Sequence, residues 1–494
     1  MSQQAAMGEM AESSKTEGGL ARKTDWKGAF WIGLSGAILV TGIAPYGILI
    51  MGAATIPVFF WVSIGAVLLC MCLAELAAMM PDRTGGMPSY AYETFKGWGT
   101  GVAKHIGGVS AWGYWLGWFA VTPINMILAA SYIASLLGLP VGATFTPISA
   151  PISTTVAIIA IVGMILLFIP CYRGIHLGAG FATFFGILSM IPLILLVILP
   201  FFKPETINWG NLAGFPLVNP NPEQGIFPLY ISWTFITIWS IFGLEAAACY
   251  IAECRDPARD AKLSIIASAA FGFFIYLALP IMMVAVLGAI ETFDPLTVFL
   301  LYTQKIFGDA VWVQWVVGIP LIAALLLSVL NAIMGCSRSL YQVAQDDVLP
   351  KFFLHTNSHG VPDYAMFFTL VISIIVVFFG SPFEIYIFSN MGYMVCVPLA
   401  LIGYFLYRHY HPELPRPVRM PDWLKYVALV LGIFLIFVWA YGGYYASDIA
   451  VAAGKRWLFF LGLVLVLLYL PLYAYRRYVE DPKDAAAEQM ATGK

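Results

Sequence analysis

One carboxylate, Glu245, stands deep inside the strongly apolar stretch 227–252. An ionised side chain in such surroundings is costly unless it is paired, protonated or facing water. A buried carboxyl group can take up and release a proton, and in its ionised form it can instead hold a cationic ligand. A protonated or hydrogen-bonded structural glutamate is the alternative. Glu245 is therefore a candidate for proton coupling.

Two of the apolar stretches contain residues that interrupt helices. The run 239–245 reads Trp-Ser-Ile-Phe-Gly-Leu-Glu, and a similar cluster near the N-terminus comprises Gly33, Gly36, Thr41, Gly42, Ala44, Pro45 and Gly47. In a broken helix, the free N–H groups of a half-helix attract a carboxylate, and unwound carbonyls accept hydrogen bonds from an ammonium group. A zwitterion satisfies both. Glycine and proline are also frequent in ordinary membrane helices, so either stretch alone leaves that alternative open.

The composition is that of a chain embedded in lipid. Of the 494 residues 61% are hydrophobic and only 11% are charged, and the formal net charge is -2. No basic excess is available to neutralise phosphates, which argues against a nucleic acid partner. The seven cysteines lack the spacing of a zinc site or of a disulfide framework, so we expect no metal and no cofactor.

Hydrophobic stretches divide the chain into membrane spans. A bilayer core about 30 Å thick needs about 20 apolar helical residues. Stretches near that length predict an all-α membrane protein with 12 transmembrane helices, at 29–54, 57–80, 111–137, 152–171, 178–201, 227–252, 264–289, 312–337, 363–380, 384–407, 424–446 and 456–475.

The distribution of basic residues predicts the orientation. Cytoplasmic loops retain lysine and arginine preferentially. With the N-terminus inside, 21 of the 25 basic residues fall in inner segments, and the four in outer loops are Lys203, Lys305, Lys455 and Arg456. We therefore expect a multi-pass protein of the bacterial inner (plasma) membrane, with cytoplasmic tails at 1–27 and 476–494.

The two interrupted stretches lie five predicted spans apart. Such a recurrence is expected of two inverted five-helix repeats that hold a substrate between them near the middle of the membrane. It predicts a first repeat at 28–201, a second at 227–407 and two additional helices in 424–475.

Several motifs in the sequence together resemble the amino acid–polyamine–organocation (APC) superfamily over about residues 30–407. They are Glu75 with Pro81 and 85–90, the run 239–245 with 252–253 and 256–259, and Ser337-Arg338 with 346–350. The resemblance implies a LeuT-type fold, with a 5+5 inverted repeat plus two C-terminal helices, and transport by alternating access. It also implies substrate contacts from the first, third, sixth, eighth and tenth helices.

Carried over by position, the resemblance implies a substrate site on the interrupted helices. Main-chain N–H groups of the first helix would receive a carboxylate, and Trp239 and Ser240 would supply carbonyls, with Trp239 also an aromatic gate. Thr122 and Ala332 replace a pocket asparagine and tryptophan of arginine-specific relatives, which argues against arginine. No catalytic residue is predicted, and the predicted substrate-binding residues are Ile38, Thr41, Gly42, Ile43, Thr122, Trp239, Ser240, Gly243 and Asn331.

Other polar and aromatic residues permit two interpretations. Asn125 and Asn331 lie inside apolar runs, where an amide either contacts substrate or joins helices by hydrogen bonds. The aromatic run 112–119 could enclose an ammonium group, but its predicted place at the start of a span favours an interfacial belt. For Glu75, near the inner end of the second span, a structural role is favoured.

These features predict a secondary transporter for a small amino acid, driven by protons or by exchange. A carrier for an amine such as ethanolamine or a polyamine is the alternative. A membrane-embedded enzyme would need catalytic His, Asp or Glu clustered at one membrane face, and the histidines are dispersed. A channel would need pore-lining rings and a selectivity segment, which the sequence lacks. Neither the coupling ion nor the oligomeric state follows from the sequence.

Overall fold

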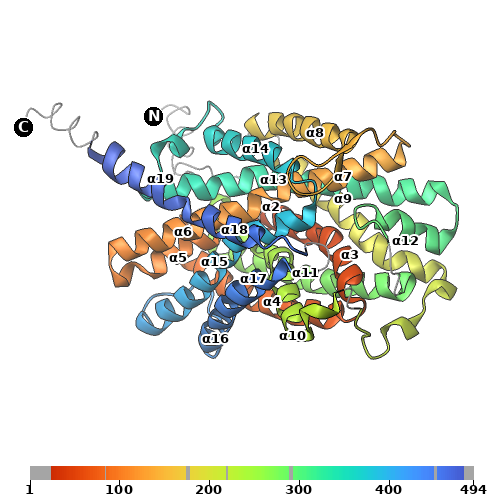
Figure 1. Ribbon diagram of the computed structural model, residues 1–494. Coiled ribbons are helices and arrows are strands. Elements are labelled where there is room, and N and C mark those ends of the chain that lie inside the picture. The colour runs from red at the N-terminus through yellow and green to blue at the C-terminus, as the bar shows by residue number, and fades with distance from the viewer. Residues whose placement is uncertain are drawn as a thin grey trace, which may run out of the picture.

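The computed structural model describes residues 24–83, 85–173, 178–218, 221–288, 293–449 and 453–482. These residues are mostly helical, and the long helices lie roughly alongside one another (Figure 1). The strands among them, β1 (Thr144–Phe145) and β2 (Ile152–Ser153), form one short antiparallel hairpin in which Thr144 faces Ser153.

The N-terminal half of the chain begins with one central helix, which is built from three segments. Its helices are α2 (Trp26–Gly33), η1 (Leu34–Leu39), α3 (Val40–Met51), α4 (Thr55–Met79), α5 (Met87–Thr94), η2 (Lys96–Trp98), α6 (Thr100–Phe119), α7 (Val121–Leu136), α8 (Thr154–Arg173), α9 (Gly178–Ile198), η4 (Leu199–Phe202), η5 (Pro204–Thr206), η6 (Trp209–Leu212) and η7 (Pro222–Gln224).

The C-terminal half begins with a second central segment and ends on the periphery. Its helices are α10 (Ile226–Ile241), η8 (Phe242–Glu253), α11 (Pro257–Leu287), α12 (Val298–Phe307), α13 (Val311–Gln345), η9 (Lys351–Leu354), α14 (Asp363–Val377), α15 (Pro382–Tyr410), α16 (Leu424–Phe437), η10 (Val438–Gly442), α17 (Gly443–Ala446), α18 (Trp457–Leu467), α19 (Tyr469–Tyr475) and η12 (Arg476–Glu480).

Ten helices of the described chain are long and apolar enough to cross a membrane. A further pair, Ile187–Phe202 with Pro204–Leu212, is bent by 97° and gives an eleventh if it is one span. Each of the twelve predicted stretches overlaps a helix, but α14 has only 15 residues, and Gly380 follows it with a φ of 81° that favours glycine. The number of twelve spans stays a prediction.

The third span extends farther than the sequence predicted. α6 and α7 together form one helix of 37 residues, Thr100–Leu136, that begins eleven residues before the predicted start at 111. The aromatic run 112–119 therefore lies in the interior of the helix, and its aromatic side chains are buried. An interfacial belt faces lipid headgroups, whereas these side chains pack inside the protein, so the structure does not support that interpretation.

Burial separates a central pair of helices from a peripheral set. Helix 1 (α2–η1–α3, Trp26–Met51) and helix 6 (α10–η8, Ile226–Glu253) have apolar windows that are 94% and 100% buried inside the protein. The window in α8 is only 22% buried, and α8 and α16 lie on opposite sides of the bundle (Figure 1). Exposed apolar side chains on peripheral helices are the expected surface for contact with lipid, whereas a fully enclosed pair can line a site.

Candidate functional site

Helix 1 changes its winding but does not unwind. A 3₁₀ segment, η1, separates two α-helical segments, and the Val40 N–H at its end is bonded to the carbonyls of Ala37 and Ile38. The sequence predicted a break at Gly42 and Pro45, but both lie in the α-helical segment α3. The Thr41 hydroxyl donates to the Ile38 carbonyl at 2.7 Å, so a side chain satisfies a main-chain acceptor beside the junction.

Helix 6 shows the same kind of change. Its α-helical part ends at Ile241, and a 3₁₀ helix of 12 residues continues to Glu253. Gly243 belongs to this 3₁₀ helix, and Trp239 and Ser240 lie in the last α-helical turn. Long 3₁₀ stretches inside helices are uncommon and often mark functional hinges. Both central helices therefore contain a hinge-like junction, although neither contains the unwound main chain that the sequence predicted.

The two junctions are in direct contact. A Cβ atom added at Gly36 would lie 2.3 Å from the Gly243 carbonyl oxygen, a distance that no side chain tolerates against backbone. The Tyr276 hydroxyl in α11 also lies 3.0 Å from the Gly36 carbonyl oxygen and 2.8 Å from that of Ser240. Sequence reasoning missed Tyr276, because nothing in its local pattern distinguishes it from other aromatic residues of an apolar helix.

Trp239 and Gly42 meet at one tyrosine from helix α15. The Trp239 Nε1–H donates to the Gly117 carbonyl at 3.0 Å, and its ring centroid lies 4.8 Å from that of Tyr386. The Tyr386 hydroxyl oxygen is 2.6 Å from where a Cβ at Gly42 would stand. The structure thus joins two predicted residues from helices 1 and 6, and it adds Tyr386, for which only the implied role of the tenth helix gave a signal.

Glu245 is fully buried beside two aromatic donors. Trp118 Nε1–H and the Tyr393 hydroxyl donate to its Oε1 at 3.4 and 3.2 Å. Its other carboxylate oxygen, Oε2, has no hydrogen-bond partner among the described residues. A carboxyl group with one free oxygen and no cation beside it is arranged to bind either a proton or a positively charged group.

The polar residues of the third span present unpaired atoms. Thr122 Oγ1 and Asn125 Nδ2 are buried and have no hydrogen-bond partner in the described chain. Leu128, one turn beyond Asn125, lies 3.2 Å from the position of a Cβ at Gly42, so this face of α7 is directed toward helix 1. The remaining predicted residues, Ile38, Ile43 and Asn331, are also buried, in η1, α3 and α13.

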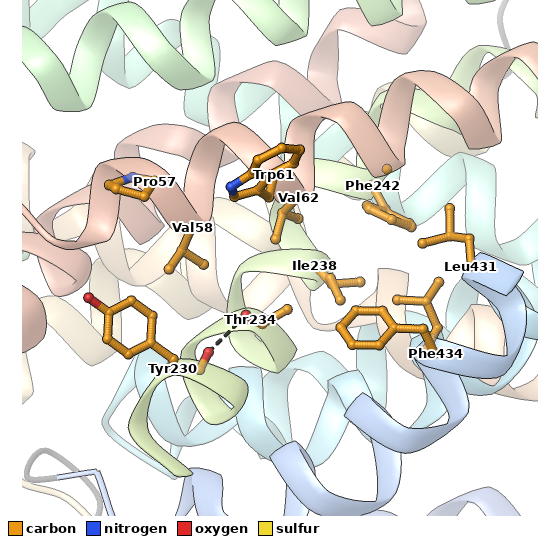
Figure 2. A pocket seen from close by; sticks show the side chains of 12 residues that line it. Pro57, Val58, Trp61, Val62, Tyr230, Thr234, Ile238, Phe242, Leu431 and Phe434 are labelled. Atoms are coloured by element: carbon orange, nitrogen blue, oxygen red, sulfur yellow. Dashed lines mark hydrogen bonds between the residues drawn. The ribbon is translucent and has the colours of Figure 1, made fainter. Parts of the chain in front are cut away.

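A groove of about 350 Å³ lies on another side of helix 6 and contains none of the predicted site residues (Figure 2). It is lined from α4, helix 6 and α16 by uncharged, mainly apolar side chains, including Trp61 and Phe434. Its hydroxyl group at Thr234 already donates to the Tyr230 carbonyl at 2.8 Å. The groove has no charged side chain in its lining, so it offers no ion-pair partner for a zwitterion.

Ion pairs gather where several helices end, at a region that we call the charged end. Arg83 forms two hydrogen bonds with Asp346, at 2.9 and 3.0 Å. Arg338 donates to Glu253 at 2.9 Å, and the Glu253 carbonyl accepts from Thr24 N–H at 3.1 Å. These contacts join the ends of α4, α13 and helix 6.

Glu75 anchors a second cluster at the charged end. It is almost fully buried, and it accepts hydrogen bonds from Arg408 at 3.1 Å, from Arg416 at 3.0 Å and from the Met420 N–H at 2.8 Å. This set of partners supports the structural interpretation of Glu75. Arg408 also reaches Asp422, where the hydrogen bond from Arg419 holds the carboxyl pKa below its usual range.

Long apolar helices around a buried central pair define a multi-pass integral membrane protein in which the polar groups described above lie between helix 1, α6–α7, helix 6 and α15. The chain belongs to the amino acid permease family, whose sequence profile matches residues 25–469. This membership confirms the resemblance to the APC superfamily. Within the described residues, no three His, Cys, Asp or Glu side chains are grouped so that they could hold a metal ion.

Several characterised transporters are similar to the chain. The arginine/ornithine antiporter of Pseudomonas aeruginosa is 25% identical over 362 residues, which cover 69% of this chain and 68% of the antiporter. The arginine/agmatine antiporter of Chlamydia trachomatis is 24% identical over 83% of this chain and 80% of its own length. The glutamate/gamma-aminobutyrate antiporter of Lactococcus lactis is 23% identical over 56% of this chain and 59% of its own length.

Proposed function

We propose that this protein is a secondary carrier that moves a small amino acid across a membrane by alternating access, with its substrate bound between helices 1 and 6. The observation that carries the proposal is the pair of facing junctions, at which both central helices change from α to 3₁₀ winding. Helices that change winding at one level can rearrange there while the α-helical parts move as rigid units. The similar antiporters favour exchange as the mode of transport.

The substrate group is inferred from the side chains around the junctions. Trp239, Tyr386, Thr122 and Asn125 provide an aromatic surface and neutral hydrogen-bonding groups, and Glu245 is the one carboxylate described there. A neutral amino acid needs main-chain partners for its two charges and no additional ion for its side chain. We therefore favour a small neutral amino acid over arginine. An amine such as ethanolamine or a polyamine is the second candidate, because Glu245 could pair with its ammonium group.

Glu245 is the candidate for proton coupling. Its free Oε2 and its neutral hydrogen-bond donors allow it to be protonated without breaking an ion pair. In its ionised form it would require a positive group from substrate or water, because a lone charge inside a span is costly. Binding of a proton and binding of a cationic substrate group are therefore linked at this residue.

The wider architecture extends the same proposal. We propose a LeuT-type arrangement of 12 spans with inverted repeats at 28–201 and 227–407, followed by helices in 424–475. The charged end is then cytoplasmic, as are both termini, in a bacterial inner membrane. This orientation agrees with the concentration of arginine at the charged end.

Counterflow in liposomes tests the function. Purified protein should take up a labelled neutral amino acid with saturation, and the same amino acid inside the vesicles should accelerate uptake. A flux that never saturates, or no flux for any amino acid or amine, would refute the carrier assignment.

Trp239→Ala tests the location of the site. Loss of this aromatic surface should raise the half-saturation concentration about tenfold, the cost of one lost aromatic contact of about 1.4 kcal/mol. Trp439→Ala is the matched control, since Trp439 also donates its Nε1–H to a carbonyl, that of Met391 at 2.9 Å, but lies in η10. Equal half-saturation concentrations in the two variants would show that Trp239 is not part of the site.

A further inference from the structure

The hydroxyl group of Tyr276 lies between the two central helices. Tyr276 is fully buried in α11, and its hydroxyl oxygen is 3.0 Å from the Gly36 carbonyl oxygen of helix 1. On helix 6 the same atom lies 2.8 Å from the Ser240 carbonyl oxygen and 2.7 Å from the Ser240 hydroxyl oxygen. One side chain from a third helix thus reaches both junctions.

The number of protons limits how these atoms can be bonded. The two carbonyls can only accept, and the hydroxyl groups of Tyr276 and Ser240 carry one proton each. If Ser240 donates to Tyr276, the single Tyr276 proton is shared between the carbonyls of Gly36 and Ser240. The contact therefore joins helix 1 to helix 6 only while both carbonyls stay close to the same hydroxyl group.

The position of this contact allows it to control the separation of helices 1 and 6. Gly36 lies in η1, where a Cβ would clash with the Gly243 carbonyl, so the Tyr276 hydroxyl group bonds beside a close contact of helices 1 and 6. We propose that Tyr276 is a positioning residue, a clasp that holds the two junctions together and sets how often helices 1 and 6 separate. Its role in transport rests on the proposed function, whereas its effect on helix separation does not.

A cysteine at the charged end can report this separation. All seven cysteines are buried and none is in a disulfide. The Cys249 sulfur in η8 lies 3.0 Å from the Tyr114 hydroxyl oxygen, and a Cβ at Gly86 would lie 2.7 Å from it. A maleimide can react with Cys249 only when η8 of helix 6 moves away from Gly86 and from Tyr114, a movement that requires helix 6 to leave its packed position. The labelling rate without substrate is then proportional to the population of the separated state, provided that opening and closing are fast.

Tyr276→Phe removes the hydroxyl group and keeps the ring. In full-length protein in liposomes, N-ethylmaleimide should label Cys249 about threefold to tenfold faster than in the wild type, the range expected for one buried hydrogen bond. Mass spectrometry of the digested protein identifies the labelled cysteine. In transport assays the same variant should change the maximal exchange rate more than the half-saturation concentration.

Tyr302→Phe is the matched control. Tyr302 is equally buried, and its hydroxyl group donates to the Leu196 carbonyl at 2.9 Å, between α12 and the end of α9, away from the junctions. It should leave the labelling of Cys249 at the wild-type rate. An equal increase in both variants, or no increase in Tyr276→Phe, overturns the proposal.

A second variant keeps the test decisive if Tyr276→Phe does not fold. Ser240→Ala leaves Tyr276 in place but removes one of the two hydroxyl protons, so it should give a smaller increase in Cys249 labelling. A wild-type rate in this variant would then overturn the proposal. Faster labelling in a protein that transports no amino acid or amine would sustain the clasp and refute the proposed function alone.

Discussion

The centre and the charged end of this protein are held together by different forces. Hydrogen bonds from neutral donors to main-chain carbonyls join the central helices, as Tyr276 does to Gly36 and Trp239 to Gly117. At the charged end the contacts are ion pairs, such as Arg83 with Asp346 and Glu75 with Arg408. Glu245 is the exception at the centre, because it is a carboxylate, and no cationic side chain of the described residues pairs with it.

This difference indicates which region can rearrange at low cost. Breaking a neutral hydrogen bond costs about 0.5–1.5 kcal/mol and leaves no charge behind. Separating a buried ion pair leaves charges without partners and costs several times more. The centre is thus suited to repeated movement, whereas the cluster around Glu75 is suited to permanent attachment.

Glu75→Ala should have the largest effect. It would leave Arg408 and Arg416 without their buried partner, which we expect to lower the free energy of unfolding by about 3–5 kcal/mol. Thermal melting in detergent would measure the loss. Asp422→Asn, at an exposed partner of the same Arg408, is the control and should shift the melting temperature little. Similar shifts in the two variants would contradict the distinction between the regions.

Gly36→Ala should have the second largest effect on stability. The added methyl group would meet the Gly243 carbonyl oxygen at 2.3 Å, and helices 1 and 6 would have to move apart. We expect a loss of about 1–3 kcal/mol in unfolding free energy together with loss of transport. Gly101→Ala in α6, where the new Cβ would meet no packed neighbour within 4 Å, should retain both. Transport at the wild-type rate in Gly36→Ala would show that close helix contact is unnecessary.

Asp346→Asn should have a smaller effect. It keeps the shape of the side chain but weakens the partly exposed pair with Arg83, for which we expect about 1 kcal/mol. The prediction is a modest fall in melting temperature and faster labelling of Cys249, because the charged end separates more often. Labelling at or below the wild-type rate would contradict the expectation that this ion pair holds the charged end together.

Glu245→Gln should leave the melting temperature nearly unchanged and act on transport alone. The amide removes the titrating proton, so uptake that depends on pH in the wild type should become independent of pH. Uptake measured over a series of external pH values would show this change. An unaltered pH profile would make Glu245 a structural residue and leave the centre without a titrating group.

The sequence predicted the helical membrane architecture well, because apolar length is a local property. The ranges at 57–80 and 424–446 lie within two residues of Thr55–Met79 and Leu424–Ala446. Errors arose where polar residues belong to a helix, as Lys104 does in α6, since hydropathy alone places such residues in a loop. The sequence predicted unwound breaks at glycine and proline, whereas the helices tighten to 3₁₀ winding instead.

The candidate site was only partly accessible from the sequence. Residue type predicted Glu245, and the family resemblance predicted Gly42 and Trp239. The structure adds the aromatic residues around them. Tyr386 and Tyr393 come from α15, more than a hundred residues farther along the chain than Glu245. No local pattern indicates which tyrosine of an apolar helix will meet them.

The sequence by itself determined that this chain is embedded in a membrane and which stretches become helices. It also determined which two of those helices differ from the rest. Tertiary structure alone decided that Gly36 touches Gly243 and that Tyr276, 240 residues beyond Gly36, bonds to it. The physical reason is the distance along the chain over which each interaction acts. Hydropathy and helix-breaking tendency act between neighbours along the chain, whereas a hydrogen bond between helices exists only after packing has brought distant residues within about 3 Å.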